Sequence, residues 1–360
     1  MRMIFHYPGP FYATPMTGEQ RRPPEMARAF SENGIDVYTI NGSAVERRRR
    51  WRSVKSRLSE FDFVYSENST LPLRLVEPAH IPLFPSPDYA LFRRAARVGV
   101  PCGVFYRDFY WRRHGFARDI GVSRYLLARH FYISEVRLYL NTMKWIFVPS
   151  KRLAAMLPSL PFGMIKELPP GGRVRERASE DEDGAGVLRV LYVGNARPPV
   201  YDLGPLIASV AGISADLVRL TLVIPTEARG YVAGGGDLPS NIEVLHVSGD
   251  KLAAVYARSD VAVMRPPKSQ YARDTVALKL YEAVGFGVPV IGFAGTRCGE
   301  LITEDGLGWS IEVEELPNLL RHLGRNRSEV QKKRKHVEKV RVKHSWVSRA
   351  RAVVGYLDGN

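Results

Sequence analysis

Short apolar segments alternate with amphipathic segments along this chain, and the alternation occurs twice. Helical spacing of apolar residues separates the apolar segments, as at 19–33 and 122–142. Short apolar strands that alternate with amphipathic helices indicate a parallel sheet covered by helices on both faces. The pattern therefore predicts two doubly wound α/β halves. The strand-like segments are 3–7, 36–40, 61–66, 101–108 and 145–150 in the first half, and 187–193, 220–225, 242–247, 260–264 and 288–293 in the second.

A stretch of Pro, Gly and charged residues separates the two halves. Residues 169–186 read PPGGRVRERASEDEDGAG, a composition that no apolar core can absorb. A chain of 360 residues also exceeds one ordinary core. We therefore predict four parts. They are an N-terminal Rossmann-like domain at 1–168, a linker at 169–188, a C-terminal Rossmann-like domain at 189–330, and basic C-terminal helices at 331–360.

The apolar segments are too short to cross a membrane. The longest, 283–295, is interrupted by Gly and Pro and falls short of the ~18 apolar residues of a membrane span. The N-terminal apolar segment ends at a Pro-Gly turn and is typical of a first strand rather than a secretory signal. Two cysteines, Cys102 and Cys298, have no His or Cys at metal-ligand spacing and are typical of buried residues in a reducing compartment. We expect a cytoplasmic protein.

The net charge of +15 is distributed unevenly. Residues 1–170 carry 26 Lys/Arg and 14 Asp/Glu, residues 171–320 carry 14 and 20, and residues 321–360 carry 12 and 3. A basic face of this size attracts anionic lipid, nucleic acid or an acidic substrate, and charge alone does not choose among them.

Two loops of the second half carry residues suited to a diphosphate. In an open parallel sheet, ligands bind beyond the carboxyl ends of the strands, where helix N-termini present free N–H groups. Gly194 follows the strand at 187–193 and permits close approach of a ligand, and Arg197 is within reach of its phosphates. The second loop, 265–274, leads into a predicted helix that begins near Thr275.

The segment Asp274–Val290, DTVALKLYEAVGFGVPV, resembles the donor-binding signature of GT-B glycosyltransferases, particularly the retaining family numbered 4, or group 1. That signature has two acidic residues with seven positions between them, followed by G-x-P-V. Here Asp274 replaces the first Glu, and Glu282 is the second, and the resemblance assigns Asp274 a catalytic role. The resemblance implies two Rossmann-like doubly wound parallel-sheet domains facing a central cleft. It also implies transfer of a sugar, of hexosyltransferase type, with no metal or other cofactor.

The same segment suggests roles for individual side chains. On a helix from Thr275, Asp274 and Glu282 are eight positions apart and share one face, together with Tyr281 nearby. The Glu282 carboxylate suits the vicinal hydroxyls of a ribose. Lys279 resembles the lysine of the K-L-x-E pattern in polysaccharide-assembly transferases, and we assign the diphosphate to Arg197 and Lys279 together. An ordinary amphipathic helix ending at glycine is the alternative.

Other segments resemble the same family more weakly. Gly18 corresponds to the second glycine of a turn that lies against the sugar donor. LPPGG at 168–172 resembles the exit from the first domain, and 344–357 resembles a final helix that crosses back to the N-terminal domain. Together these likenesses cover nearly the whole chain, and they assign Gly18, Gly194, Arg197, Lys279, Tyr281 and Glu282 to the donor.

An aromatic and basic cluster follows the strand at 101–108. Relatives keep a polar residue at this strand end, facing the acceptor, so Asp108 is the candidate general base if transfer inverts the anomeric centre. If transfer retains configuration, Asp108 positions the acceptor together with Arg107, Trp111 and His114. A salt bridge between Asp108 and a neighbouring arginine is the alternative.

The basic segment ERRRRWR at 46–52 and the aromatic residues near 110–116 suit a membrane interface, although a solvated helix face is the alternative. We therefore expect a nucleotide-sugar glycosyltransferase, using a UDP-sugar or similar donor and a glycan or lipid-linked acceptor, peripheral on the inner face of the plasma membrane. Retention is favoured. Two other functions remain open: a non-hydrolysing sugar-nucleotide epimerase of the same fold, and a nucleic-acid-binding protein that uses the basic first half.

Overall fold

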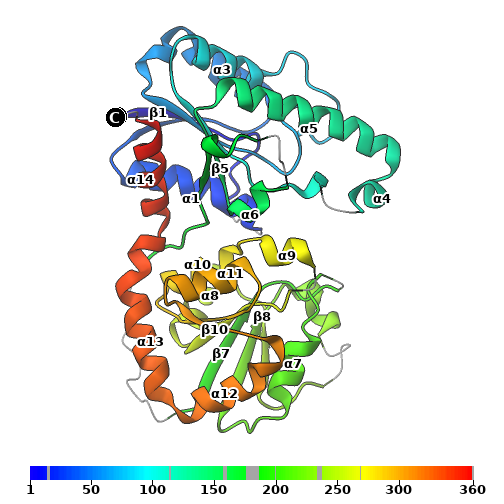
Figure 1. Cartoon of the computed structure of the whole chain (residues 1–360), viewed down its shortest axis with the longest axis vertical. Helices are drawn as coiled ribbons and strands as arrows, with labels where there is room; N and C mark the ends of the chain where they lie inside the picture. Colours follow the sequence, from blue (N-terminus) through cyan, green and yellow to red (C-terminus); the bar gives the residue numbers. More distant parts are fainter. Residues whose placement is uncertain are drawn as a thin grey trace. The chain divides into compact units, whose positions relative to one another are not determined.

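The chain forms two compact units in the computed structural model (Figure 1). Unit 1 comprises Met1–Pro170 and Trp346–Asn360, and unit 2 comprises Gly171–Ser345. The structure describes residues 1–13, 17–112, 115–156, 160–175, 186–198, 200–232, 237–267 and 269–358. Residues 176–185, half of the predicted linker at 169–188, lie outside these residues.

Unit 1 is built on a six-stranded sheet in which all neighbouring strands are parallel. The strand order is β2-β1-β3-β4-β5-β6, and Ile4 of β1 lies between Tyr38 and Val64 of its two neighbours. The side chains of Met3, Ile4 and Phe5 are fully buried, as expected for a strand covered on both faces. The strands are β1 (Arg2–His6), β2 (Asp36–Ile40), β3 (Phe63–Glu67), β4 (Cys102–Phe105), β5 (Trp145–Val148) and β6 (Ile165–Glu167).

The helices of unit 1 begin at capping residues that the sequence supplies. The Thr17 hydroxyl caps α1, and Ser43 and Glu46 form a reciprocal capping box on α2. The last helix, α14, belongs to unit 1 and packs against α1 (Figure 1). The helices are α1 (Gly18–Glu32), α2 (Ala44–Val54), α3 (Pro87–Arg97), α4 (Phe116–Ile120), α5 (Val122–Thr142), α6 (Lys151–Ala154) and α14 (Trp346–Leu357), with short 3-10 turns η1 (Lys55–Glu60), η2 (Tyr110–Arg112) and η3 (Phe162–Met164).

Unit 2 repeats this architecture with a second parallel six-stranded sheet. Its strand order is β12-β11-β10-β7-β8-β9. The strands are β7 (Leu188–Val193), β8 (Val218–Val223), β9 (Ile242–Leu245), β10 (Val261–Val263), β11 (Val290–Phe293) and β12 (Gly308–Ile311). The helices are α7 (Gly204–Ala211), α8 (Gly249–Ala257), α9 (Gln270–Asp274), α10 (Leu278–Gly285), α11 (Arg297–Glu304), α12 (Leu316–Arg325) and α13 (Arg327–Val340), with 3-10 turns η4 (Thr226–Tyr231), η6 (Val313–Glu315) and η7 (Arg341–His344).

These two parallel sheets confirm the α/β, doubly wound prediction, and two local expectations need correction. The sheet of unit 1 does not end at the strand near residue 148, because β6 pairs with β5. The helix expected from Thr275 begins only at Leu278, and Asp274 ends a separate helix, α9. In the part of the chain that the structure describes, no helix has the length and apolarity needed to cross a membrane.

Candidate functional site

The strand order of unit 2 locates its ligand crevice. The chain proceeds from β7 through β8 to β9 toward one edge of the sheet, and from β10 through β11 to β12 toward the other. Ligands of doubly wound sheets bind beyond the carboxyl ends of the strands at this reversal. A cavity of about 250 Å³ lies at this position, lined by Val193 and Gly194 after β7 and by Val263 and Met264 at the end of β10.

The wall of this cavity carries positive charge without a carboxylate. Arg265 and Lys279 line it, and none of the lining residues that the structure describes is Asp or Glu. The guanidinium of Arg265 donates from Nη1 to the Val200 carbonyl and lies 5.0 Å from the ring centre of Tyr201. The Arg265 guanidinium and the Lys279 ammonium together form a site suited to an anion.

Gly194 leaves room where the chain turns after β7. A Cβ atom added there would lie 2.5 Å from the hydroxyl oxygen of Tyr192, which itself donates to the Asn195 carbonyl at 2.8 Å. The tyrosine hydroxyl therefore occupies the space beside the glycine. The predicted donor residue Gly194 thus lies on the cavity wall.

Lys279 reaches the cavity because α10 begins at Leu278 and not at Thr275, where the sequence predicted it. The Cys298 sulfur, on α11, accepts the Ala277 N–H at 3.4 Å and donates to the Thr275 carbonyl at 3.6 Å. These bonds hold the segment 275–277 outside the helix, so Lys279 lies in the first turn of α10. Its ammonium is 2.7 Å from the carboxylate of Glu282, one turn along the helix. Glu282 thus holds Lys279 and does not itself line the cavity.

Two predicted donor residues, Arg197 and Tyr281, and the predicted catalytic residue Asp274 lie elsewhere in unit 2. Arg197 is exposed, 6.0 Å from the ring centre of Tyr231, and does not line the cavity. Tyr281 is 1% exposed and stacks on the His344 ring at 5.5 Å, in the core. Asp274 receives hydrogen bonds from Gln270 at the end of α9, so it does not share a helix with Glu282 as the spacing predicted. Sequence reasoning passed over Arg265, although it closely follows a strand.

In unit 1, the predicted acceptor-side residues Arg107 and Asp108 lie together after β4. The Arg107 guanidinium is 2.6 Å from the Glu19 carboxylate and 3.5 Å from that of Asp108. The Thr70 hydroxyl donates to Asp108 at 3.3 Å. Glu19 was not predicted from the sequence. It follows Gly18, the first residue of α1, after the carboxyl end of β1.

Two of the aromatic residues predicted to meet acceptor or membrane, Trp111 and Trp51, are buried. Trp111 is 4% exposed, donates from Nε1 to the Tyr106 hydroxyl at 3.1 Å, and stacks on the Tyr132 ring. Trp51, within ERRRRWR, is 8% exposed. Neither side chain can insert into a membrane from these positions, which corrects the sequence expectation. His114 lies outside the described residues.

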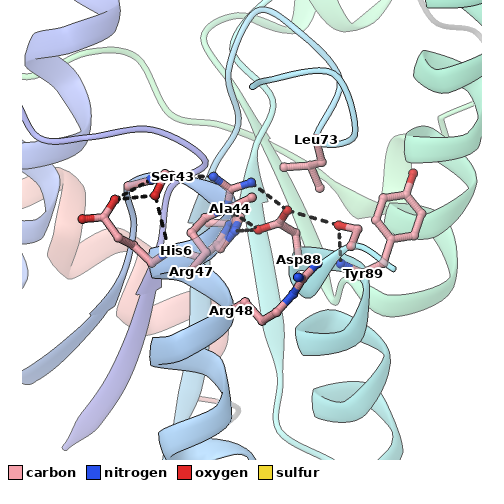
Figure 2. Close-up of polar contacts among 12 residues, drawn as sticks. His6, Ser43, Ala44, Arg47, Arg48, Leu73, Asp88 and Tyr89 are labelled. Carbon is pink, nitrogen blue, oxygen red and sulfur yellow. Dashed lines mark hydrogen bonds and ion pairs between the residues drawn. The ribbon is translucent and has the colours of Figure 1, made fainter. Parts of the chain in front are cut away.

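A charged network lies inside unit 1 (Figure 2). His6 Nε2 is 2.8 Å from the Asp88 carboxylate, and Arg47 donates to both carboxylate oxygens, at 2.8 and 3.2 Å. All three side chains are fully buried. Although burial alone would raise the pKa of Asp88, the His6 hydrogen bond and the Arg47 charge hold it well below its ordinary value. The network joins β1, α2 and α3 in the interior of unit 1.

Comparison with known proteins identifies a family region and a fold. Residues 218–355 match the family described as glycosyl transferase-like. No curated protein matches the chain in sequence. Among solved structures, HepE of Anabaena in complex with UDP and glucose is similar, with 13% identity, a TM-score of 0.62, and 99% of this chain and 100% of that chain covered.

Two further structures are similar over their whole length. WaaG, a glycosyltransferase involved in lipopolysaccharide biosynthesis, has 16% identity and a TM-score of 0.61, with 100% of both chains covered. Sucrose-phosphate synthase from Thermosynechococcus elongatus has 13% identity and a TM-score of 0.63, with 99% of this chain and 98% of that chain covered. At these identities the likeness shows the fold, and it confirms the predicted GT-B architecture.

Proposed function

We propose that this chain, a glycosyltransferase of the GT-B fold, moves a sugar from a nucleoside-diphosphate sugar to a glycan or lipid-linked acceptor of a cell-surface polysaccharide or glycolipid. The family region at 218–355 and the fold support transferase activity. The observation that carries the choice of donor is the cavity of unit 2, with two cations and no carboxylate on its wall.

Arg265 and Lys279 are the proposed contacts for the donor diphosphate. Charge-assisted hydrogen bonds to phosphate oxygens are about twice as strong as neutral ones, and a planar guanidinium pairs with phosphate in two places. The same cations would stabilise the charge that develops on the leaving diphosphate. This assignment replaces Arg197 with Arg265, because only Arg265 lines the cavity. We propose that the two side chains serve in place of a metal ion.

Glu282 has a proposed positioning role besides its predicted contact with a ribose. Its carboxylate, 12% exposed, holds the Lys279 ammonium at 2.7 Å. Fixing a long lysine side chain in advance lowers the conformational entropy lost on ligand binding. We also propose that the Glu282 carboxylate accepts hydrogen bonds from the vicinal hydroxyls of the donor ribose.

The acceptor is proposed to meet unit 1 near Arg107 and Asp108, after the carboxyl end of β4. Both side chains are about one-sixth exposed and held by mutual contact and by Thr70. In a retaining reaction, which we favour, Asp108 positions the acceptor hydroxyl. We also propose that the enzyme works in the cytoplasm, with its basic unit 1 toward the inner membrane surface.

Replacement of each cation tests the donor assignment. Calorimetry with UDP, the nucleotide bound in HepE of Anabaena, compares wild type with Arg265→Ala, Lys279→Ala and the matched control Arg197→Ala. Loss of a hydrogen bond to a charged group costs about 1.5–3 kcal/mol, so we expect each cavity variant to bind UDP about 10- to 100-fold more weakly. The control should bind normally. Unchanged affinity in both cavity variants would refute the site.

A further inference from the structure

Unit 1 carries two adjoining hollows over α3, η1 and the C-terminal half of α5. One hollow is about 370 Å³ and the other about 440 Å³, and Arg93 and Arg97 line both. Arg137 of α5 completes the first hollow, and Lys55 of η1 and Arg94 complete the second. We call these five residues the arginine groove. The helices α2, α3 and α5 and the turn η1 that form it pack against one another within unit 1.

The charges of the arginine groove are not neutralised by the protein. No residue in the described part of the chain forms an ion pair with any of its five cations. The carboxylates of the same helices point inward, since Asp88 of α3 and Glu135 of α5 are each 1% exposed. Glu60, at the end of η1, pairs instead with Arg2. All the charged side chains that line the groove in the described part of the chain are therefore cationic.

The cations of the groove and the neutral polar groups beside them select the ligand chemistry. Ser56, Asn141 and Thr142 supply these neutral hydrogen-bonding groups, and the apolar lining consists of two alanines with the buried Trp51 and Leu138. Guanidinium groups bind phosphate oxygens in pairs, which suits phosphate better than an apolar or neutral sugar ligand. Arg93 and Arg97 are one helical turn apart, about 6 Å along the axis, so both can serve two neighbouring anions.

We propose that the arginine groove binds a ligand with two neighbouring phosphate-class anions, one in each hollow. Two sources have this chemistry: the headgroups of an anionic phospholipid surface, and a soluble diphosphate. Of the two tryptophans on which the sequence placed membrane contact, Trp111 lies outside the groove, and Trp51 lines the second hollow with its side chain 8% exposed. The groove lies within unit 1, whereas the cavity with Arg265 and Lys279 lies within unit 2, so this site goes beyond the proposed transferase site and does not depend on it.

A triple variant tests the groove in the full-length protein. Arg93→Gln, Arg97→Gln and Arg137→Gln together remove three charges, and glutamine keeps a helix propensity close to that of arginine. The matched control, Arg219→Gln, Lys251→Gln and Arg325→Gln, removes three charges from exposed sites of unit 2. Each basic residue near an anionic surface contributes about a fivefold gain in affinity, so the groove variant should lose on the order of 100-fold.

Two ligands distinguish the sources. Sedimentation with vesicles of phosphatidylcholine and phosphatidylglycerol in equal parts, against phosphatidylcholine alone, reports lipid binding, and calorimetry with inorganic pyrophosphate reports the soluble source. Selective loss by the groove variant with either ligand supports the proposal and names the source. Equal loss in the control shows that net charge alone acts, and overturns it. Binding of neither ligand by wild type, or binding only of duplex DNA, also overturns it.

Two readouts keep the result independent of folding and of the transferase site. The thermal unfolding midpoint of the groove variant should match that of the control variant, because all three arginines are exposed. Its affinity for UDP should equal that of wild type. If the transferase proposal is wrong, wild type fails to bind UDP in unit 2 while the loss on vesicles or pyrophosphate persists. If the groove proposal is wrong, wild type binds UDP in unit 2, and the groove variant shows no selective loss on vesicles or pyrophosphate.

Discussion

Replacing Glu135 by Gln should abolish a specific pH dependence of stability. Glu135 lies on α5, is 1% exposed, and accepts the Leu73 N–H. Burial raises the pKa of this carboxyl from 4.5 to about 8, against a smaller lowering by the Leu73 N–H. No described lysine, arginine or histidine forms an ion pair with Glu135. Glutamine keeps the acceptor for Leu73 without the ionisable proton.

The raised pKa of Glu135 determines the sign and the size of the change in the free energy of unfolding with pH. Between pH 4.5 and about 8 the folded protein holds the Glu135 proton while the unfolded chain has lost it, so the free energy of unfolding falls as pH rises. One pKa unit corresponds to about 1.4 kcal/mol, so the full shift corresponds to roughly 5 kcal/mol. In the Glu135→Gln variant, this contribution to the pH dependence of the free energy of unfolding is absent. Relative to wild type, the variant should therefore gain stability progressively from pH 5 to pH 8.

Urea unfolding at a series of pH values measures this difference. Tryptophan fluorescence reports chiefly on unit 1, since Trp51, Trp111, Trp145 and Trp346 belong to it and only Trp309 belongs to unit 2. Other titrating groups contribute equally to both proteins and cancel in the comparison. A difference between variant and wild type that stays constant from pH 5 to pH 8 would refute the argument. Such a constant difference would show that Glu135 is ionised in the folded state throughout this range.

Two further outcomes concern carboxylates of unit 1. Asp88→Ala leaves the buried Arg47 guanidinium without its main partner, so we expect a loss of about 3–5 kcal/mol in the free energy of unfolding, measured by urea titration. A loss below about 1 kcal/mol would show that water reaches the network. For Asp108→Asn, we expect retained turnover with a raised acceptor KM, from steady-state kinetics. A fall in kcat of roughly 10²–10⁴ would instead identify Asp108 as the general base of an inverting reaction.

The sheets could be predicted because the spacing of apolar residues and the length of each apolar segment are properties of the local sequence. The start of α10 could not be predicted in this way. The spacing of Asp274 and Glu282 fits one helix, yet segment 275–277 is diverted by hydrogen bonds to Cys298, which is distant in sequence. The spacing of residues within one segment cannot indicate a hydrogen bond to a residue that is distant in sequence. The two acidic residues consequently lie on separate helices.

Two site residues could have been assigned better from the sequence. Arg265 closely follows a predicted strand, but its importance depends on the strand order, which places β10 beside β7 at the reversal. Trp51 could have been recognised as buried, because Arg47, Trp51 and Val54 recur at helical spacing and form the inward face of α2. The many arginines of this segment hid the helical spacing of its buried residues. Arg47 itself is the charged residue that this face buries.

The placement of α14 in unit 1 affects how the protein folds as it is made. Asn33 of α1 donates to the Val347 carbonyl, Arg22 lies beside the Trp346 ring, and Trp145 donates to the Tyr356 carbonyl. Unit 2 is contiguous in sequence, whereas unit 1 needs residues that the ribosome synthesises after all of unit 2. The unit synthesised first is thus the one completed last. Until then α1 has an uncovered apolar flank, on which a chaperone can act during translation.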